Sequence, residues 1–130
     1  MARLYLVGEL DERAGREVIE GILEAEEDVD LFISTCGGLY SMSIAIMNAM
    51  HITKVKVNTH AIGFSHSSGS VVLAAGTGKR IMYEGSSMIV HCLAVDYEKT
   101  MTSHEIAAES AKLNSDNINH IHLLAKLTGN

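Results

Sequence analysis

Hydrophobic and polar positions repeat along this chain with two periods, one typical of strands and one typical of helices. Short β-rich runs alternate with stretches in which apolar residues recur at helical spacing. The pattern predicts strands at residues 4–7, 29–34 and 55–62, with helices at residues 11–25 and 40–51 between them. This βαβαβ order predicts an α/β layer fold, in which ligand chemistry gathers at the carboxyl ends of the strands.

The remaining elements follow the same logic. The pattern predicts a helix of small residues at 67–75, strands near 80–83 and 88–92, and a closing helix at about 102–127. In the first helix, Asp11 is a favourable N-cap residue, and Val18 and Ile22 recur on one side with glutamates opposite. One helix face is therefore expected to be buried and the other solvated.

Composition excludes several classes of function. The chain has 130 residues, 47% of them hydrophobic, which suits one compact domain. Its formal charge of −6 leaves no basic face for nucleic acid, and its apolar runs are shorter than the ~20 residues of a bilayer span. We expect no leader, since no charged-then-apolar run opens the sequence, and Cys36 and Cys92 have no CxxC spacing. We expect no nucleic-acid or membrane partner, and a cytoplasmic protein with reduced thiols.

A serine-rich stretch, "GFSHSSGS" at residues 63–70, follows the third predicted strand. A serine at a strand-to-helix turn lies near free backbone N–H groups that stabilise an oxyanion. Serine is also a favoured N-cap residue, so Ser67 has a catalytic and a structural interpretation. The esterase elbow G-x-S-x-G selects Ser65 instead, but Ser67 stands where its last glycine belongs.

A nucleophilic serine needs a base, and His91 is the strongest candidate because it ends the apolar run "SSMIVH". A lone histidine there is also common as a structural residue. His51 and His60 have no visible partner, and His66 beside Ser67 is expected to be a neighbour of the site and not its base.

Other chemistry is less favoured. His120 and His122 are separated by two positions on a helix, so they do not share a face, and His104 does not complete a metal-ligand spacing. We therefore expect no metal and no cofactor. A cysteine nucleophile at Cys36 or Cys92 has no paired base at a recognisable spacing.

Five motifs follow one another along the chain: the opening strand and helix, the glycine pair of "STCGG", the turn "GFSHSSGS", the segment "AAGTGKR" and the strand "SSMIVH". Their order resembles the proteolytic subunit of the Clp protease, a serine peptidase of the Clp/crotonase fold. A glycine pair alone is weak evidence of a functional site, since it also occurs in ordinary turns. It does allow backbone N–H groups to approach a bound carbonyl closely. The resemblance covers nearly the whole chain.

The resemblance implies a ββα superhelix in a single domain, with a head at about residues 1–92 and a protruding handle helix in residues 93–130. It implies Ser67 as nucleophile, His91 as general base, and the N–H groups of Gly38 and Ser68 as the oxyanion hole. It further implies peptide-bond hydrolysis of polypeptide substrates inside stacked heptameric rings, with an AAA+ unfoldase or a host Clp subunit as partner.

The chain departs from the family pattern in places. The counterpart of the family's triad aspartate would lie beyond residue 130, and its absence leaves the imidazole without tautomer control, a loss of ~10⁴ in rate. We also expect the protein to lack the family's N-terminal axial segment, which touches the unfoldase. Cys36 replaces the family's proline before the glycine pair, and Cys92 with Leu93 replaces its Gln-Pro after the histidine. Ser65 with His66 replaces a small apolar pair beside the nucleophile.

Two alternatives to an active peptidase stay open. One is a catalytically silent or regulatory ring subunit, and the other is an acyl-CoA-binding enzyme on the related crotonase fold, which needs neither Ser67 nor His91. Contact with another subunit is expected on physical grounds, because the closing helix carries more apolar side chains than a small sheet covers. These are Ile106, Leu113, Ile118, Ile121 and Leu124.

Overall fold

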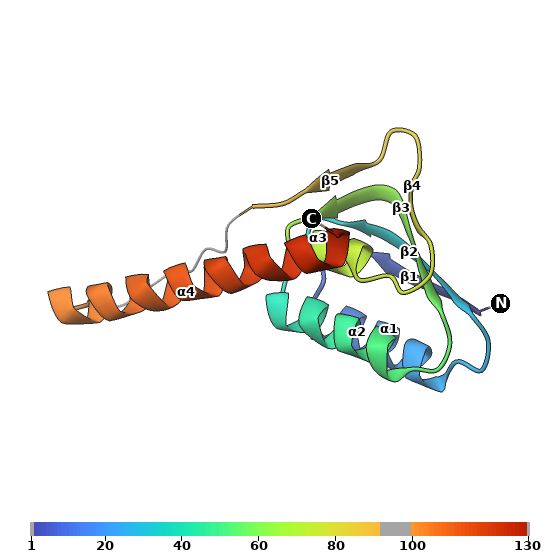
Figure 1. The fold of residues 1–130 in the computed structure, drawn as a ribbon, viewed down its shortest axis with the longest axis horizontal. Helices are drawn as coiled ribbons and strands as arrows, with labels where there is room; N and C mark the ends of the chain where they lie inside the picture. Colours follow the sequence, from blue (N-terminus) through green and yellow to red (C-terminus); the bar gives the residue numbers. More distant parts are fainter. Residues whose placement is uncertain (1, 92–99, 130) are drawn as a thin grey trace. The chain divides into compact units, whose positions relative to one another are not determined.

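The computed structural model describes residues 2–91 and 100–129. The elements, in chain order, are β1 (Ala2–Val7), α1 (Glu12–Glu24), β2 (Val29–Thr35), α2 (Tyr40–Ile52), β3 (Val57–His66), α3 (Ser68–Ala74), β4 (Arg80–Met82), β5 (Ser87–Ile89) and α4 (Ser103–Thr128) (Figure 1). The chain divides into two compact units, Met1–Val90 and His91–Asn130. Each unit is described by itself below.

The first unit is built on a parallel sheet with strand order β1-β2-β3-β4. β5 also pairs with β3 in parallel, further along that strand. β4 contacts Thr59–Ala61, whereas β5 contacts Phe64–His66. The predicted α/β layer fold is therefore confirmed, and the carboxyl end of β3 lies between β2 and β5.

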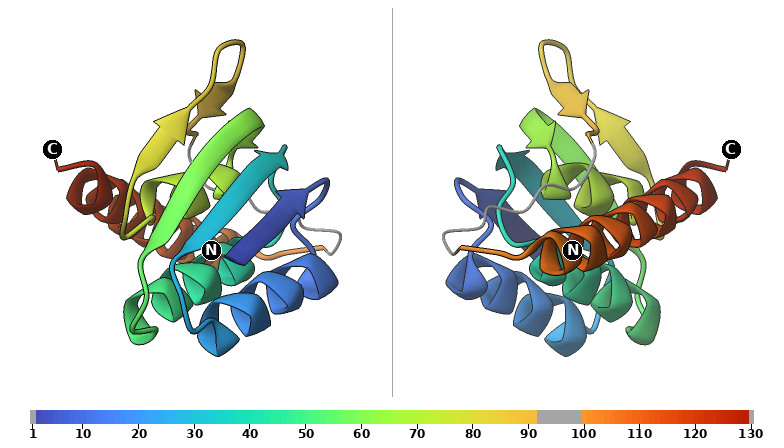
Figure 2. Two further views of the ribbon diagram at one scale, coloured as in Figure 1. Left: turned by 90° about the vertical axis from the view of Figure 1, so that its right-hand side faces the viewer. Right: turned by 90° about the vertical axis from the view of Figure 1, so that its left-hand side faces the viewer.

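Helices cover one face of this sheet, with α1 and α2 side by side on it (Figure 2). In β2, Val29, Leu31 and Ile33 are fully buried, while the residues between them are partly exposed. α3 joins the same face, where the hydroxyl of Thr59 donates to the carbonyl oxygen of Leu73 at 2.7 Å. This alternation places the hydrophobic core between the sheet and the helices.

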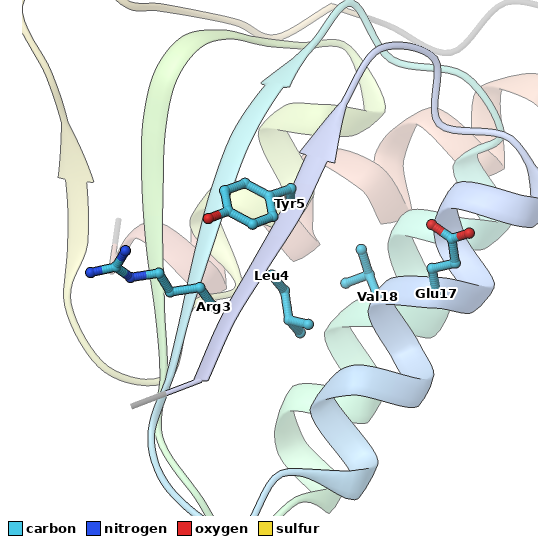
Figure 3. Close-up of a pocket in the computed structure, with 5 residues that line it drawn as sticks. All are labelled: Arg3, Leu4, Tyr5, Glu17 and Val18. Atoms are coloured by element: carbon cyan, nitrogen blue, oxygen red, sulfur yellow. The ribbon is translucent and has the colours of Figure 1, made fainter.

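The edge strand β1 shows the same alternation at close range (Figure 3). Leu4 points toward the side of α1 that carries Val18, whereas Arg3 and Tyr5 lie on the other side of the strand. As predicted, Asp11 is the N-cap of α1, and its carboxylate accepts from the N–H of Ala14 at 2.8 Å.

β3 extends four residues beyond the predicted end at residue 62. Glycine and serine in "GFSH" suggested a loop, but this segment pairs with β5, and Ser65 pairs with Thr35 of β2. A register irregularity between Ile33 and Thr35 accommodates the longer β3. Gly63 is needed there because a Cβ would overlap the Ser34 hydroxyl. Strand neighbours therefore decide the length of β3.

The sheet face opposite the helices carries a row of stacked rings. Tyr5 stacks on Phe32 with a centroid distance of 5.8 Å, and Phe32 stacks on His60 at 4.6 Å. His60 stacks in turn on Tyr83 at 5.8 Å. The row crosses β1, β2 and β3 and ends at Tyr83, which directly follows β4. These ring contacts stabilise the pairing of neighbouring strands.

The expectation that His60 has no partner is wrong. Its Nε2 lies 2.9 Å from a carboxylate oxygen of Asp30, and its Nδ1 lies 3.0 Å from the Tyr83 hydroxyl. The hydrogen bond from His60 lowers the pKa of Asp30, and the amide of Asn58, 3.1 Å away, adds to this against the opposing effect of burial. Because the carboxylate accepts, Nε2–H donates, and in the neutral ring Nδ1 accepts from Tyr83.

The second unit contains α4. Its N-cap residue is Thr102, whose hydroxyl accepts from the N–H of Glu105 at 3.1 Å. The helix ends at Gly129, which adopts the left-handed conformation with φ 80°. Ile118 and Ile121 are more than half exposed. Within residues 2–91 and 100–129, the helices are all too short or too polar to cross a bilayer.

We expect Asp30→Asn to lower the free energy of unfolding by about 1 kcal/mol at pH 7. Since the folded-state pKa of Asp30 is lowered, its stabilising effect is present above the pKa of the unfolded carboxyl and is lost as pH falls through the folded value. The difference between the two proteins should shrink below about pH 4. Urea unfolding at pH 7 and pH 3 measures this, and an equal difference at both values would contradict it.

Candidate active site

Ser67 lies where β3 ends and α3 begins. Its backbone has φ 57° and ψ −124°, and among the described residues it is the only non-glycine residue with a positive φ. A side chain in that region is strained by about 1–3 kcal/mol, so surrounding contacts must hold it. Such strain at a strand-to-helix turn is typical of an exposed nucleophile.

Backbone hydrogen bonds hold Ser67 from two sides. Its N–H donates to the carbonyl oxygen of Ile89 at 2.8 Å, and its carbonyl oxygen accepts from the N–H and the hydroxyl of Ser70 at 2.9 and 2.5 Å. The Ser67 hydroxyl makes no capping hydrogen bond to α3. Ser67 is thus the N-cap residue by position only, and the interpretation of its side chain as a cap is wrong.

The glycine pair after β2 lies against this turn. A Cβ on Gly37 would be 2.9 Å from the Cβ of Ser67, and one on Gly38, at φ 152°, would overlap the carbonyl oxygen of Leu10. The Ser68 hydroxyl donates to the carbonyl oxygen of Gly38 at 3.4 Å. Three of the predicted site residues, Gly38, Ser67 and Ser68, are therefore close together.

An open depression of about 690 Å³ adjoins the glycine pair. Its lining includes Gly38, Ser34, Phe64 and the exposed Cys36. A depression of this volume accommodates a short segment of an extended ligand. The glycine backbone is thus accessible from outside the first unit's core.

Ser65, the alternative nucleophile of the elbow pattern, is fully buried. Within the described part of the chain its hydroxyl has no hydrogen-bond partner. A hydroxyl closed off in this way does not reach a substrate, so the elbow interpretation is wrong. The turn presents Ser67 instead.

His91 is the first residue of the second unit. The preceding strand, β5, ends at Ile89, so the prediction that the strand reaches the histidine is wrong by two residues. Within the second unit, burial lowers the pKa of His120, and the positive charge of His91 lowers it further. This relation between His91 and His120 had no signal in the sequence spacing.

The hydrogen-bonded pair of His66 and Ser87 also had no signal in the sequence. The Nε2 of His66 lies 2.7 Å from the hydroxyl of Ser87, the first residue of β5. The His66 ring stacks on Phe64 with a centroid distance of 4.4 Å. The pairing arises because β5 lies beside the end of β3, and no local motif indicates it.

Three aspartates of the first unit are already engaged. Asp11 caps α1, Asp28 accepts from the N–H of Lys56, and Asp30 binds His60. Cys92 and Asp96 lie outside the described residues. Among residues 2–91 and 100–129, no three histidine, cysteine or acidic side chains are grouped so as to hold a metal ion.

The model of one protein family, Clp protease, matches residues 2–130. The chain belongs to the Clp protease family. This membership confirms the resemblance inferred from the motifs and the Clp/crotonase-like fold class, and it places the chain among the Clp-like peptidases. The parallel sheet and the glycine pair against the Ser67 turn are thus features of a Clp protease family member.

The strain at Ser67 predicts a difference between two variants that both remove the hydroxyl. We expect Ser67→Gly to be more stable than Ser67→Ala by about 1 kcal/mol, since glycine adopts a positive φ freely and alanine does not. The added unfolded-state entropy of glycine reduces this gain without cancelling it. Urea unfolding of both variants measures the difference, and a more stable alanine variant would refute the strain.

The orphaned hydroxyl of Ser65 predicts a stabilising substitution. We expect Ser65→Ala to raise the free energy of unfolding by about 1 kcal/mol, since it removes a buried hydroxyl that has no partner in the described residues. Thermal or urea unfolding measures this. Ser70→Ala is the matched control and should be destabilising, because the Ser70 hydroxyl donates to Ser67. A loss of stability in Ser65→Ala would show that the hydroxyl is satisfied.

Proposed function

We propose that this chain is a serine endopeptidase that hydrolyses polypeptides through an acyl-enzyme on Ser67, with His91 as general base and then general acid. The observation that carries the proposal is the conformation of Ser67. A strained positive φ, held by backbone hydrogen bonds while the hydroxyl is left free of the helix, is expected of a nucleophile. A merely structural serine would gain nothing from this conformation.

The proposed oxyanion hole consists of the N–H groups of Gly38 and Ser68. Ser68 is the first residue of α3, so its N–H has no intrahelical partner. Gly38 lies next to it, as the hydrogen bond between the Ser68 hydroxyl and the Gly38 carbonyl indicates. Two convergent backbone donors of this kind stabilise a tetrahedral intermediate, and each is worth about 10²–10³ in rate.

Chain connectivity supports His91 as the partner of Ser67. The N–H of Ser67 donates to the carbonyl oxygen of Ile89, and His91 follows Ile89 by two residues. Two extended residues span at most about 7 Å, so the Cα of His91 lies within about 7 Å of the Cα of Ile89.

In the proposed reaction, the Ser67 hydroxyl attacks the peptide carbonyl carbon, His91 takes its proton, and the protonated imidazole then gives it to the leaving amine. Water hydrolyses the acyl-enzyme by the same route.

We further propose that the chain works in the cytoplasm as a homo-oligomer, as members of the Clp protease family form rings that cooperate with unfoldases. The second unit, with α4, is the proposed handle between subunits. Its Ile106, Ile118 and Ile121 are more than half exposed, which is the apolar surface that a subunit contact would cover. An ATPase unfoldase is the proposed source of extended polypeptide.

The nucleophile is tested by intact-mass labelling with a fluorophosphonate probe, followed by peptide mapping. We expect an adduct that maps to Ser67, is absent from Ser67→Ala and forms at least about 100-fold more slowly in His91→Ala. His51→Ala removes an exposed histidine of α2 and serves as the matched control, with unchanged labelling expected. Ser68→Ala keeps its N–H and should also label.

Each alternative has its own outcome in this experiment. A Ser67 adduct whose rate is the same in His91→Ala would refute the proposed base. No adduct on Ser67 in the folded wild-type protein would refute the peptidase and favour a silent ring subunit. Thioester binding that both substitutions leave unchanged would favour the acyl-CoA enzyme.

A further inference from the structure

Ser87 and His66 lie within hydrogen-bond distance of each other, and neither takes part in the proposed peptidase. The Nε2 of His66 is 2.7 Å from the Oγ of Ser87, and both side chains are half-buried. We propose that Ser87 is a second nucleophile of this chain, with His66 as its base, acting on esters with a short apolar acyl group.

The pair is held by the pairing of β3 with β5. Phe64 pairs with Ser87 and His66 pairs with Ile89, so all four side chains are on the same face of the sheet. This is the face opposite the helices, which also carries Phe32 and His60. The hydroxyl of Ser87 is therefore presented beside His66 by strand register and not by a flexible loop.

The imidazole is oriented by a ring contact. Phe64 stacks on His66 with a centroid distance of 4.4 Å and an interplanar angle of 21°. In the tautomer with its proton on Nδ1, the Nε2 of His66 accepts the hydroxyl hydrogen of Ser87. This is the arrangement that a general base needs before the nucleophile reacts.

A backbone donor lies beside the serine. The N–H of Ser67 donates to Ile89, so the polar groups of Ile89 face β3, and those of Met88 face the opposite edge of β5. Among the described residues, β5 pairs with β3 only. The N–H of Met88, which follows Ser87, is thus placed to donate to a developing oxyanion.

The surroundings indicate the substrate class. Ile62, Phe64 and Ile89 are each nearly half exposed on this face, at 46%, 48% and 48%. Such side chains favour an uncharged, apolar acyl chain. In the reaction, the Ser87 oxygen bonds to the ester carbonyl carbon while His66 takes the serine proton. The bond to the alcohol oxygen breaks, His66 protonates that oxygen, and water then releases the acid.

The test uses the full chain carrying Ser67→Ala, so that the proposed peptidase nucleophile is absent. We expect fluorophosphonate labelling to give an adduct that maps to Ser87, and we expect hydrolysis of p-nitrophenyl butyrate. Both should fall at least about tenfold when Ser87→Ala or His66→Gln is added. Ser86→Ala is the matched control and should change neither, because the Ser86 hydroxyl donates to the Tyr83 carbonyl.

Two results would overturn the second nucleophile. One is the absence of an adduct on Ser87 in the folded Ser67→Ala protein. The other is hydrolysis that Ser87→Ala leaves unchanged, and this variant is conservative enough to keep the fold. Because the Ser67 and Ser87 adducts map to different residues, failure of this inference is distinguishable from failure of the proposed peptidase.

Discussion

The hydrogen bond from the Ser67 N–H to the Ile89 carbonyl oxygen is the contact on which the candidate site depends. It fixes a strained backbone at 2.8 Å from the end of β5, and it extends the pairing of β3 with β5 by one residue. The same contact anchors the segment that leads to His91. Without it, Ser67 would lose one of the backbone contacts that hold its strained positive φ.

Strain at Ser67 also bears on the choice between chemistries. An acyl-CoA enzyme of the related fold needs only backbone N–H groups, so it has no use for a serine held at φ 57°. The proposed serine peptidase needs a hydroxyl that is not engaged in capping, and the Ser67 hydroxyl makes no capping hydrogen bond to α3. The geometry of this residue thus supports the proposed peptidase over the acyl-CoA alternative.

Polar side chains on the two faces of the sheet differ in their hydrogen bonding and burial. On the face opposite the helices, Asp30 with His60 and Ser87 with His66 form hydrogen-bonded pairs that retain some contact with water. On the helix face, the hydroxyl of Ser65 is buried and, among the described residues, unpaired. Each hydrogen bond on the open face offsets the desolvation of a partly or largely buried side chain, whereas the Ser65 hydroxyl has no such compensation among the described residues.

The amino-acid sequence by itself determined the order and type of the elements. Helix and strand periods are local properties, so the βαβαβ order, the N-cap at Asp11 and the glycine pair beside a strand end were all predictable. The motif order was sufficient to indicate the family that the match over residues 2–130 confirms.

Tertiary structure decided the features that depend on neighbours distant in the chain. β5 extended β3 to His66, packing buried Ser65, and parallel pairing placed His60 beside Asp30 and His66 beside Ser87. The positive φ of Ser67 belongs to the same class, because a strained backbone exists only where several distant contacts hold it together.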